Sequence, residues 1–311
     1  MEHSVLAVGL NPVMQKTIVL NQLWENEVNR SNEYIFTVAG KGANTARVLN
    51  ELGANPIHLS HAGGLFRETF LKMLKDDGIT STIVDSKSEI RLCYTLINKE
   101  KSTVTEIVEE ALPVDPQCDN RLRAEYKKAI KKVALVTISG TKARGYKEDI
   151  VPWMVEEATK LGKMIVLDVC GDDLLNSLKF RPTLINPNLK EFSETLFPEA
   201  LFMEHKPQDE ILQIVKEKML ELEKVYGITT VLTQGVKSIF SNQKGAIVEH
   251  KVEPVTPVNT IGSGDAFTAG VAYGLTKSLP LNRCIEIGIA CGKANALNLK
   301  TGTIEGGDIP L

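Results

Sequence analysis

The sequence lacks the features that mark several large classes of protein. Its formal net charge is only −3, with acidic and basic residues interspersed, so it has no basic stripe of the kind that binds nucleic acid. No apolar run approaches the ~18 residues that a membrane span needs. The opening MEHSVLAVGLNPV has no basic segment before its apolar run, so no signal peptide is expected. We therefore expect a cytoplasmic protein with neither nucleic-acid nor membrane partners.

The sequence also lacks paired cysteines. The five that it has form no CxxC pair, and they are Cys93, Cys118, Cys170, Cys284 and Cys291. Neither a disulfide framework nor a zinc site is therefore expected. We expect reduced thiols that pack as small apolar side chains.

What the sequence does contain is an alternation of short apolar runs with longer segments of helical period. Over 311 residues, this favours one α/β domain with a mainly parallel sheet covered by helices on both faces. The expected strands are Val5–Leu10, Ile57–His61, Val133–Ile138, Met164–Asp168, Thr183–Asn186 and Thr229–Thr233. The expected helices are Ala43–Leu52, Phe66–Asp77, Tyr146–Leu161, Asp209–Tyr226 and Leu281–Leu299.

Two regions, at about 12–37 and 90–108, break this alternation. Within the second, Arg91–Asn98 and Ser102–Val108 have the pattern of a β-hairpin. Because a helix and a strand of the main domain separate the two regions, they predict a small discontinuous β-sheet that serves as a lid over a cleft. The unpaired edges of such a sheet lead us to expect a homodimer.

The segment Gly262-Ser263-Gly264-Asp265 is the strongest candidate for a catalytic centre. Two glycines flank Ser263, and a helical pattern begins at Asp265. Glycines let backbone amides point into one concavity, and a helix N-terminus favours a phosphate there. Asp265 would then lie beside the phosphate as a general base for an acceptor hydroxyl. The alternative is that Ser263 and Asp265 only cap a helix.

A second glycine-rich segment, Gly40-Lys41-Gly42, precedes the expected helix that starts at Ala43. Lys41 and Asn44 would project from this loop and first turn toward the cleft. The GxxxxGK[ST] spacing of a Walker A loop is absent, so this is not a P-loop kinase by that signature. The alternative for Lys41 is a solvated surface lysine.

These segments, in this order, resemble the PfkB family of sugar kinases, which has the ribokinase-like fold. The similarity extends over essentially the whole chain. The matching segments are LNPVMQ (10–15), AGKGAN (39–44), Arg91 in SEIRLCYTLI, TISGT (137–141), DVCGDDL (168–174), INPNLKEF (185–192), LTQG (232–235) and TIGSGDAF (260–267). Within the family the chain is most similar to the subgroup of 1-phosphofructokinase and tagatose-6-phosphate kinase.

The resemblance implies roles for the matching residues. It implies catalysis by Asp265 with Gly262, Ser263 and Gly264. It implies substrate contacts from Gln15, Arg30, Gly40, Lys41, Asn44, Arg91 and Ser139. It implies nucleotide binding by Asn188, Thr233, Gly235, Gly262, Gly264 and Asn295, and placement of magnesium through water by Asn188 and Glu191. A monovalent cation near the 254–262 loop would also fit the family.

Four positions depart from the family pattern, all on the substrate side. Gln15 replaces the usual aspartate, Ala39 replaces a glycine, Arg67 stands where glycine is common, and Val108 replaces an asparagine. The phosphate-transfer segment is intact.

Together these observations favour a kinase that uses ATP and Mg²⁺ to phosphorylate a hydroxyl of a hexose phosphate. Fructose 1-phosphate, tagatose 6-phosphate and fructose 6-phosphate all fit. Arg30, Lys41 and Arg91 supply the cationic groups that could hold the substrate phosphate. Two alternatives stay open: a kinase for an unphosphorylated sugar or nucleoside, and a binding protein or sensor without turnover, prompted by Gln15 and Arg67.

Overall fold

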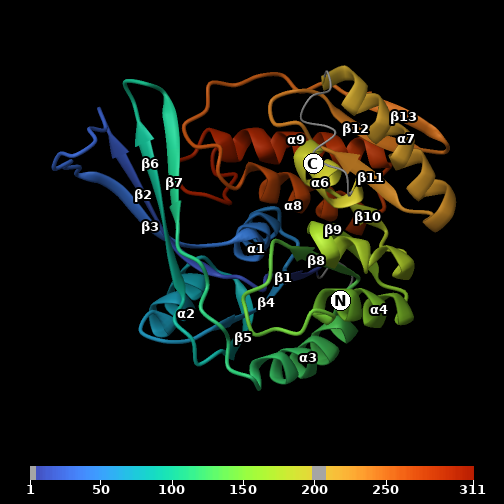
Figure 1. The fold of residues 1–311 in the computed structure, drawn as a ribbon, viewed down its shortest axis with the longest axis horizontal. Coiled ribbons are helices and arrows are strands. Elements are labelled where there is room, and N and C mark those ends of the chain that lie inside the picture. Colours follow the sequence, from blue (N-terminus) through green and yellow to red (C-terminus); the bar gives the residue numbers. More distant parts are fainter. Residues whose placement is uncertain (1–4, 198–207) are drawn as a thin grey trace.

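The computed structural model describes residues 5–197 and 208–311. A nine-stranded sheet forms the centre of the described chain, in the order β13-β12-β11-β10-β9-β8-β1-β4-β5 (Figure 1). Its strands from β11 to β5 are parallel, and β12 and β13 add an antiparallel hairpin at one edge. Their bounds are β1 Val5–Val8, β4 Ile57–Ala62, β5 Thr80–Asp85, β8 Leu135–Ser139, β9 Met164–Asp168, β10 Leu184–Ile185, β11 Thr229–Leu232, β12 Ile239–Gln243 and β13 Ala246–His250.

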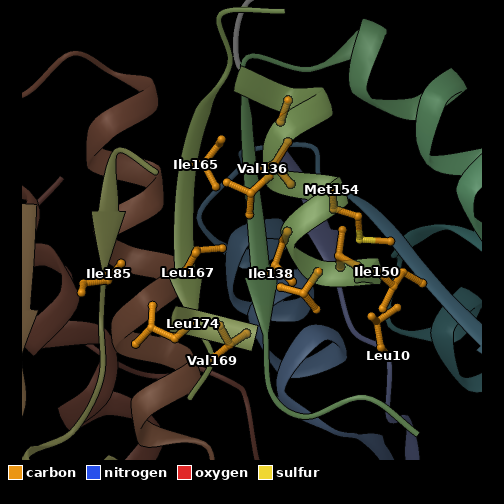
Figure 2. Close-up of a cluster of buried hydrophobic side chains, with 14 of the residues drawn as sticks. Leu10, Val136, Ile138, Ile150, Met154, Ile165, Leu167, Val169, Leu174 and Ile185 are labelled. Carbon is orange, nitrogen blue, oxygen red and sulfur yellow. The ribbon is translucent and has the colours of Figure 1, made fainter. Parts of the chain in front are cut away.

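Both faces of this sheet are buried, so successive strand residues enter two separate apolar clusters. In β1, Leu6 and Val8 pack into one cluster, whereas Val5 and Ala7 pack into the other. Figure 2 shows part of the first cluster, where side chains of β8 and β9 lie against Ile150 and Met154. This arrangement explains why the strands appear in the sequence as continuous apolar runs.

Helices cover the two faces of the sheet. The first cluster includes side chains of α3 Cys118–Ala129, α4 Ile150–Lys160, α6 Leu189–Leu196 and α7 Gln208–Tyr226. The second includes side chains of α1 Lys41–Glu51, α2 Arg67–Asp76, α8 Ser263–Thr276 and α9 Leu281–Ala296. The short segments α5 Gly171–Leu175, η1 Ile130–Lys132 and η2 Leu178–Phe180 complete the described helices.

A separate four-stranded sheet, the small sheet, projects from one end of the main body (Figure 1). Its order is β3-β2-β6-β7, with bounds β2 Val13–Leu20, β3 Glu33–Ala39, β6 Arg91–Asn98 and β7 Thr103–Val108. β2 pairs with β3 and β6 with β7 in antiparallel fashion, whereas β2 and β6 are parallel. The parallel pairing joins the two insertions into one sheet, and the predicted fold class is therefore confirmed.

Each strand and helix expected from the sequence is present, with ends that differ by a few residues. The largest difference for function is in α8, which begins at Ser263 rather than at Asp265. All five cysteines are free, as expected, but Cys170 is exposed and does not pack as a core residue. Among the described residues, no helix is both long enough and apolar enough to cross a membrane.

Candidate active site

Three adjoining cavities lie at the carboxyl ends of the parallel strands, and residues of the small sheet line two of them. The large cavity has a volume of about 840 Å³, the central cavity about 400 Å³ and the small cavity about 160 Å³. Thr233 and Gly264 line both the large and the central cavity, and Lys41 and Arg91 line both the central and the small one. Because neighbouring cavities share walls, they form one cleft.

The loop at Gly262 enters this cleft at the N-terminus of α8. Gly262 has a left-handed backbone with φ 84°, and a Cβ there would lie 2.9 Å from the backbone nitrogen of Gly302. A side chain is thus excluded by both conformation and space. Gly262 and Gly264 line the central cavity, and Ser263 and Gly264 line the large one. The first turn of α8, where backbone N–H groups lack helical partners, therefore faces both cavities.

Asp265 lies on this first turn and is only 6% exposed. The Nδ2 of Asn44, on α1, donates a hydrogen bond of 2.8 Å to its Oδ2. Burial raises the pKa of Asp265, Glu191 raises it further, and Lys41 together with the Asn44 hydrogen bond lowers it. Asp265 is thus a carboxylate with a raised pKa at the N-terminus of α8. This setting suits a general base.

Lys41, at the start of α1, joins the same cluster of carboxylates. Its Nζ lies 3.0 Å from Asp168 Oδ1 and 3.6 Å from Glu191 Oε1. Burial would lower the pKa of Lys41, but Asp168, Asp265 and Glu191 together hold it above its ordinary value. Burial and the two neighbouring carboxylates raise the pKa of Asp168 to about 7, against the effect of Lys41. Three carboxylates thus share one ammonium group, which leaves an excess of negative charge.

This excess charge makes the cluster suitable for a hard divalent cation. Asn188 and Glu191 form a capping box at the start of α6, in which each side chain bonds the other's backbone N–H at 2.9 Å. The Oδ1 of Asn186 is buried without a partner in the central cavity. Among the described residues, no three His, Cys, Asp or Glu side chains form a metal site.

Four of the six residues expected to bind a nucleotide line the large cavity, whereas Gly262 lines only the central one. Thr233, Gly235 and Asn188 line the large cavity, together with apolar side chains such as Phe267. Asn295 has a different position. It is fully buried, its Nδ2 bonds Ile261 O and Ser263 Oγ, and its Oδ1 accepts from the N–H of Gly302. Its contacts therefore support the Gly262 loop.

Most of the residues expected on the substrate side line the central or the small cavity. Gln15 lines the central one, Ser139 the small one, and Gly40 and Arg91 line both. Arg30 is different: it is exposed on the connection between β2 and β3 and lines none of the three cavities. Of the three cationic residues expected to hold the substrate phosphate, only Lys41 and Arg91 therefore lie in the cleft of one copy of the chain. The placement of Arg30 there was wrong.

The positions that depart from the family pattern fall in two groups. Gln15 and Val108 line the central cavity and Ala39 lines the small one. Arg67, by contrast, begins α2, pairs with Glu68 and lines none of the cavities. Its effect on the cleft is therefore indirect.

The sequence-based reasoning assigned no role to several polar residues of the central cavity, among them Asp168, Asn186 and Glu106. Asp168 ends β9 and Asn186 follows β10, so their location at the carboxyl ends of parallel strands was a usable signal. Glu106 gave no such signal, because it lies on β7 of the small sheet. Burial and Asp265 raise its pKa, whereas Arg91 lowers it.

Comparison with known proteins gives a consistent result. A family model described as pfkB family carbohydrate kinase matches residues 3–305. Two structures of phosphofructokinase-2 from Escherichia coli, one with potassium and one with fructose-6-phosphate, share 20% identity at a TM-score of 0.82. The alignments cover 97% of this chain and 94% and 96% of theirs. A structure described as a possible 1-phosphofructokinase from Thermotoga maritima has 23% identity and a TM-score of 0.85, over 96% of this chain and 93% of that one. At these identities the solved structures establish the fold.

Proposed function

This chain belongs to the pfkB family of carbohydrate kinases, and from that premise we propose that it transfers the γ-phosphate of ATP to a hydroxyl of a hexose phosphate. It is a phosphotransferase with an alcohol group as acceptor. The observation that best supports the finer assignment is the position of Asp265. This buried carboxylate lies on the first turn of α8, in a cavity that Lys41 and Arg91 also line.

In the proposed reaction, Asp265 is the general base. It accepts the proton of the acceptor hydroxyl while the hydroxyl oxygen bonds to the γ-phosphorus, and the bond to the bridging oxygen of ADP breaks. The backbone N–H groups of residues 262–265 stabilise charge on the phosphoryl oxygens. The small sheet acts as a lid that keeps water from the phosphate.

We assign ATP to the large cavity. Its volume of about 840 Å³ is within the range usual for ligand pockets, and Ser263 and Gly264 connect it to the loop of α8. Mg²⁺ would neutralise the polyphosphate, held through water by Asn188 and Glu191 near Asp168. A monovalent cation near the 254–262 loop is also part of the proposal, since one similar structure of another protein contains potassium.

The substrate class rests on charge. Lys41 and Arg91 line both the central and the small cavity, where a substrate phosphate could accept hydrogen bonds from them. The test is ADP release by the purified protein with fructose 1-phosphate, fructose 6-phosphate and tagatose 6-phosphate, beside neutral hexoses and nucleosides. We expect a phosphorylated hexose to give the highest kcat/KM. A neutral acceptor that outperforms all of them would refute the phosphate assignment.

A binding protein without turnover is the remaining alternative, prompted by Gln15. In the structure Gln15 is buried, and its Nε2 bonds Thr95 Oγ1, so its amide is held by the small sheet. Binding of both ligands without any ADP release would favour this alternative over a kinase.

We also propose that two copies of this chain form a homodimer through the small sheet. β7 is an edge strand that is exposed at all six residues, and the apolar Ile107 points to the face opposite that of Glu106 and Val108, which line the central cavity. A second copy would cover this surface and the unpaired strand edge. Phosphofructokinase-2 of Escherichia coli has a tetrameric inhibited form, so sedimentation must separate monomer, dimer and tetramer.

A further inference from the structure

Arg47 is the largest fully buried side chain of the described residues, and it has no place in the reaction outlined so far. It lies on α1 and is only 1% exposed. An arginine is almost never buried unless its charge and its N–H groups are satisfied. The hydrogen-bond partners of the Arg47 guanidinium therefore indicate its role.

The guanidinium connects four separate parts of the chain. Its Nε donates to Asp77 Oδ2 at 2.8 Å, just past α2, and its Nη2 donates to Val38 O at 2.6 Å, near the end of β3. Its Nη1 donates to Thr301 O at 2.9 Å and to Asn44 Oδ1 at 3.3 Å. The last contact reaches the residue that bonds the catalytic carboxylate.

The amide of Asn44 has one acceptor and one donor end, and its two partners require opposite ends. Arg47 has only donors, so it must face Oδ1. Asp265 as a carboxylate has only acceptors, so it must face Nδ2, at 2.8 Å. If the amide turned over, its oxygen would face the carboxylate and the hydrogen bond would be lost. Arg47 thus selects the orientation in which Asn44 donates to Asp265.

The neighbouring backbone holds Asn44 as well. Gly302 has φ 64°, and a Cβ there would lie 2.5 Å from Asn44 Cβ, so this backbone packs directly on the asparagine. The N–H of Gly302 also donates to Asn295 Oδ1 at 2.6 Å, and Asn295 supports the Gly262 loop. The segment anchored by Arg47 at Thr301 therefore touches both the partner of the base and the phosphate loop.

We propose that Arg47 is a positioning residue for the phosphoryl transfer, which acts by fixing the Asn44 amide as a hydrogen-bond donor to Asp265. The proposal rests on the proposed function, in which Asp265 is the general base. Without that hydrogen bond, the deprotonated form of Asp265 loses a stabilising partner. The reaction should then require a higher pH.

Other charged groups also act on Asp265. They are Lys41 of α1, Glu191 of α6, Glu106 of β7 and Asp168 of β9. None of them has a hydrogen bond or ion pair with Arg47 among the described contacts. A substitution at Arg47 therefore leaves these four charged groups in place. A change in the pH dependence of kcat/KM would then reflect the loss of the hydrogen bond from Asn44 to Asp265.

The test compares Arg47→Lys with the control Asp77→Asn. Both weaken the partly buried ion pair of Arg47 with Asp77. In the control the new amide oxygen still accepts from Nε of Arg47 and leaves the Asn44 contact intact, although the ion pair of Asp77 with Lys300 is lost. With the best acceptor of the wild type, we expect Arg47→Lys to lower kcat about tenfold. It should also move the acidic limb of the kcat/KM profile to higher pH by roughly one unit. A shift of this size corresponds to the free energy of a hydrogen bond to a charged group. The KM for ATP should be unchanged, and Asp77→Asn should lower only the Tm.

An acidic limb that stays at the wild-type pH in Arg47→Lys would overturn the proposal, because Arg47 would then have only a structural role. If Arg47→Lys does not fold, the double variant Arg47→Gln with Asp77→Asn removes both charges of this ion pair. It is compared with Asp77→Asn alone, and the same pH shift is expected. A wild type without kinase activity on any acceptor is a separate result. It would refute the proposed function, and the role of Arg47 with it.

Discussion

The wall of the cleft formed by α1 and α8 is buried and tightly hydrogen-bonded, whereas the wall formed by the small sheet is partly exposed to solvent. In the first wall a Cβ on Gly42 would lie 2.5 Å from Gly9 Cα, and a Cβ on Gly302 equally close to Asn44 Cβ. In the second, every residue of β7 is exposed. We infer that the groups proposed for phosphoryl transfer are fixed by the packing of the main domain. The exposed side chains of β7 that line the central cavity can change at less cost to the fold than residues of α1 and α8 can.

The largest effect on kcat is expected from a substitution of Asp265, the proposed general base in the buried wall. We predict that Asp265→Asn lowers kcat by roughly 10²–10⁴-fold, because general base catalysis is lost, while nucleotide binding persists. Asp173→Asn is the matched control, since Asp173 is a buried carboxylate paired with Lys142 outside the cavities. Steady-state ADP production with calorimetric ATP binding measures both effects. Unchanged ADP production in Asp265→Asn would exclude Asp265 as the base.

The next effect concerns the loop of the same wall. Gly262→Ala should lower kcat by about 10²-fold or more, because the new Cβ meets Gly302 N at 2.9 Å and displaces N–H donors from the phosphoryl oxygens. Gly171→Ala is the control, with φ 61° and no atom within 4 Å of its new Cβ. Both variants carry backbone strain, but only the first moves the loop. Equal kcat values in the two variants would contradict this role of the loop.

A smaller effect is expected on the substrate wall. Arg91→Gln should raise the KM for a phosphorylated hexose by roughly 10–100-fold, since a charge-assisted hydrogen bond to phosphate is lost. The KM for ATP and the activity on neutral sugars should stay the same. Arg67→Gln, outside the cavities, provides the comparison. If Arg91→Gln instead lowers kcat with no change in KM, the two walls do not divide chemistry and sugar binding in this way.

The smallest effect on activity is expected on the outer surface of the small sheet. Ile107 is 54% exposed on β7, and Ile107→Asp should convert a dimer to a monomer because it places a charge in the contact. Sedimentation velocity measures the mass, and Tyr34→Asp on β3 tests the opposite edge strand. A wild type that is monomeric at all concentrations would end the dimer proposal.

Much of this fold could be predicted from the sequence. The parallel strands are buried on both faces and therefore appear as apolar runs such as Met164–Asp168, whose bounds agree with β9. The hairpin predicted at Arg91–Asn98 and Ser102–Val108 agrees with β6 and β7 to within one residue. The start of α8 was misplaced by two residues, because Gly262 adopts a positive φ and the helix begins directly after it.

The polar core of the site was harder to predict. Arg47 looks like a surface charge in the sequence, because only the tertiary fold brings Asp77 and Thr301 O to its guanidinium. For Arg30 the error has the opposite direction. Its charge suggested that it holds the substrate phosphate, but it is exposed and lies outside the cleft. Local patterns predict which elements form. They do not predict which charges the elements enclose.

The parallel pairing of β2 with β6 has a consequence for how the molecule assembles. It joins segments that α1, β4, α2 and β5 separate in the chain. The paired residues Val13 and Arg91 are 78 positions apart in the chain, fewer than the 130 positions between Val5 and Leu135 in the pairing of β1 with β8. Because loop-closure entropy grows only slowly with the length of the closed loop, closing the small sheet costs no more than closing the main sheet. We therefore expect the two sheets to form together in one cooperative transition during refolding.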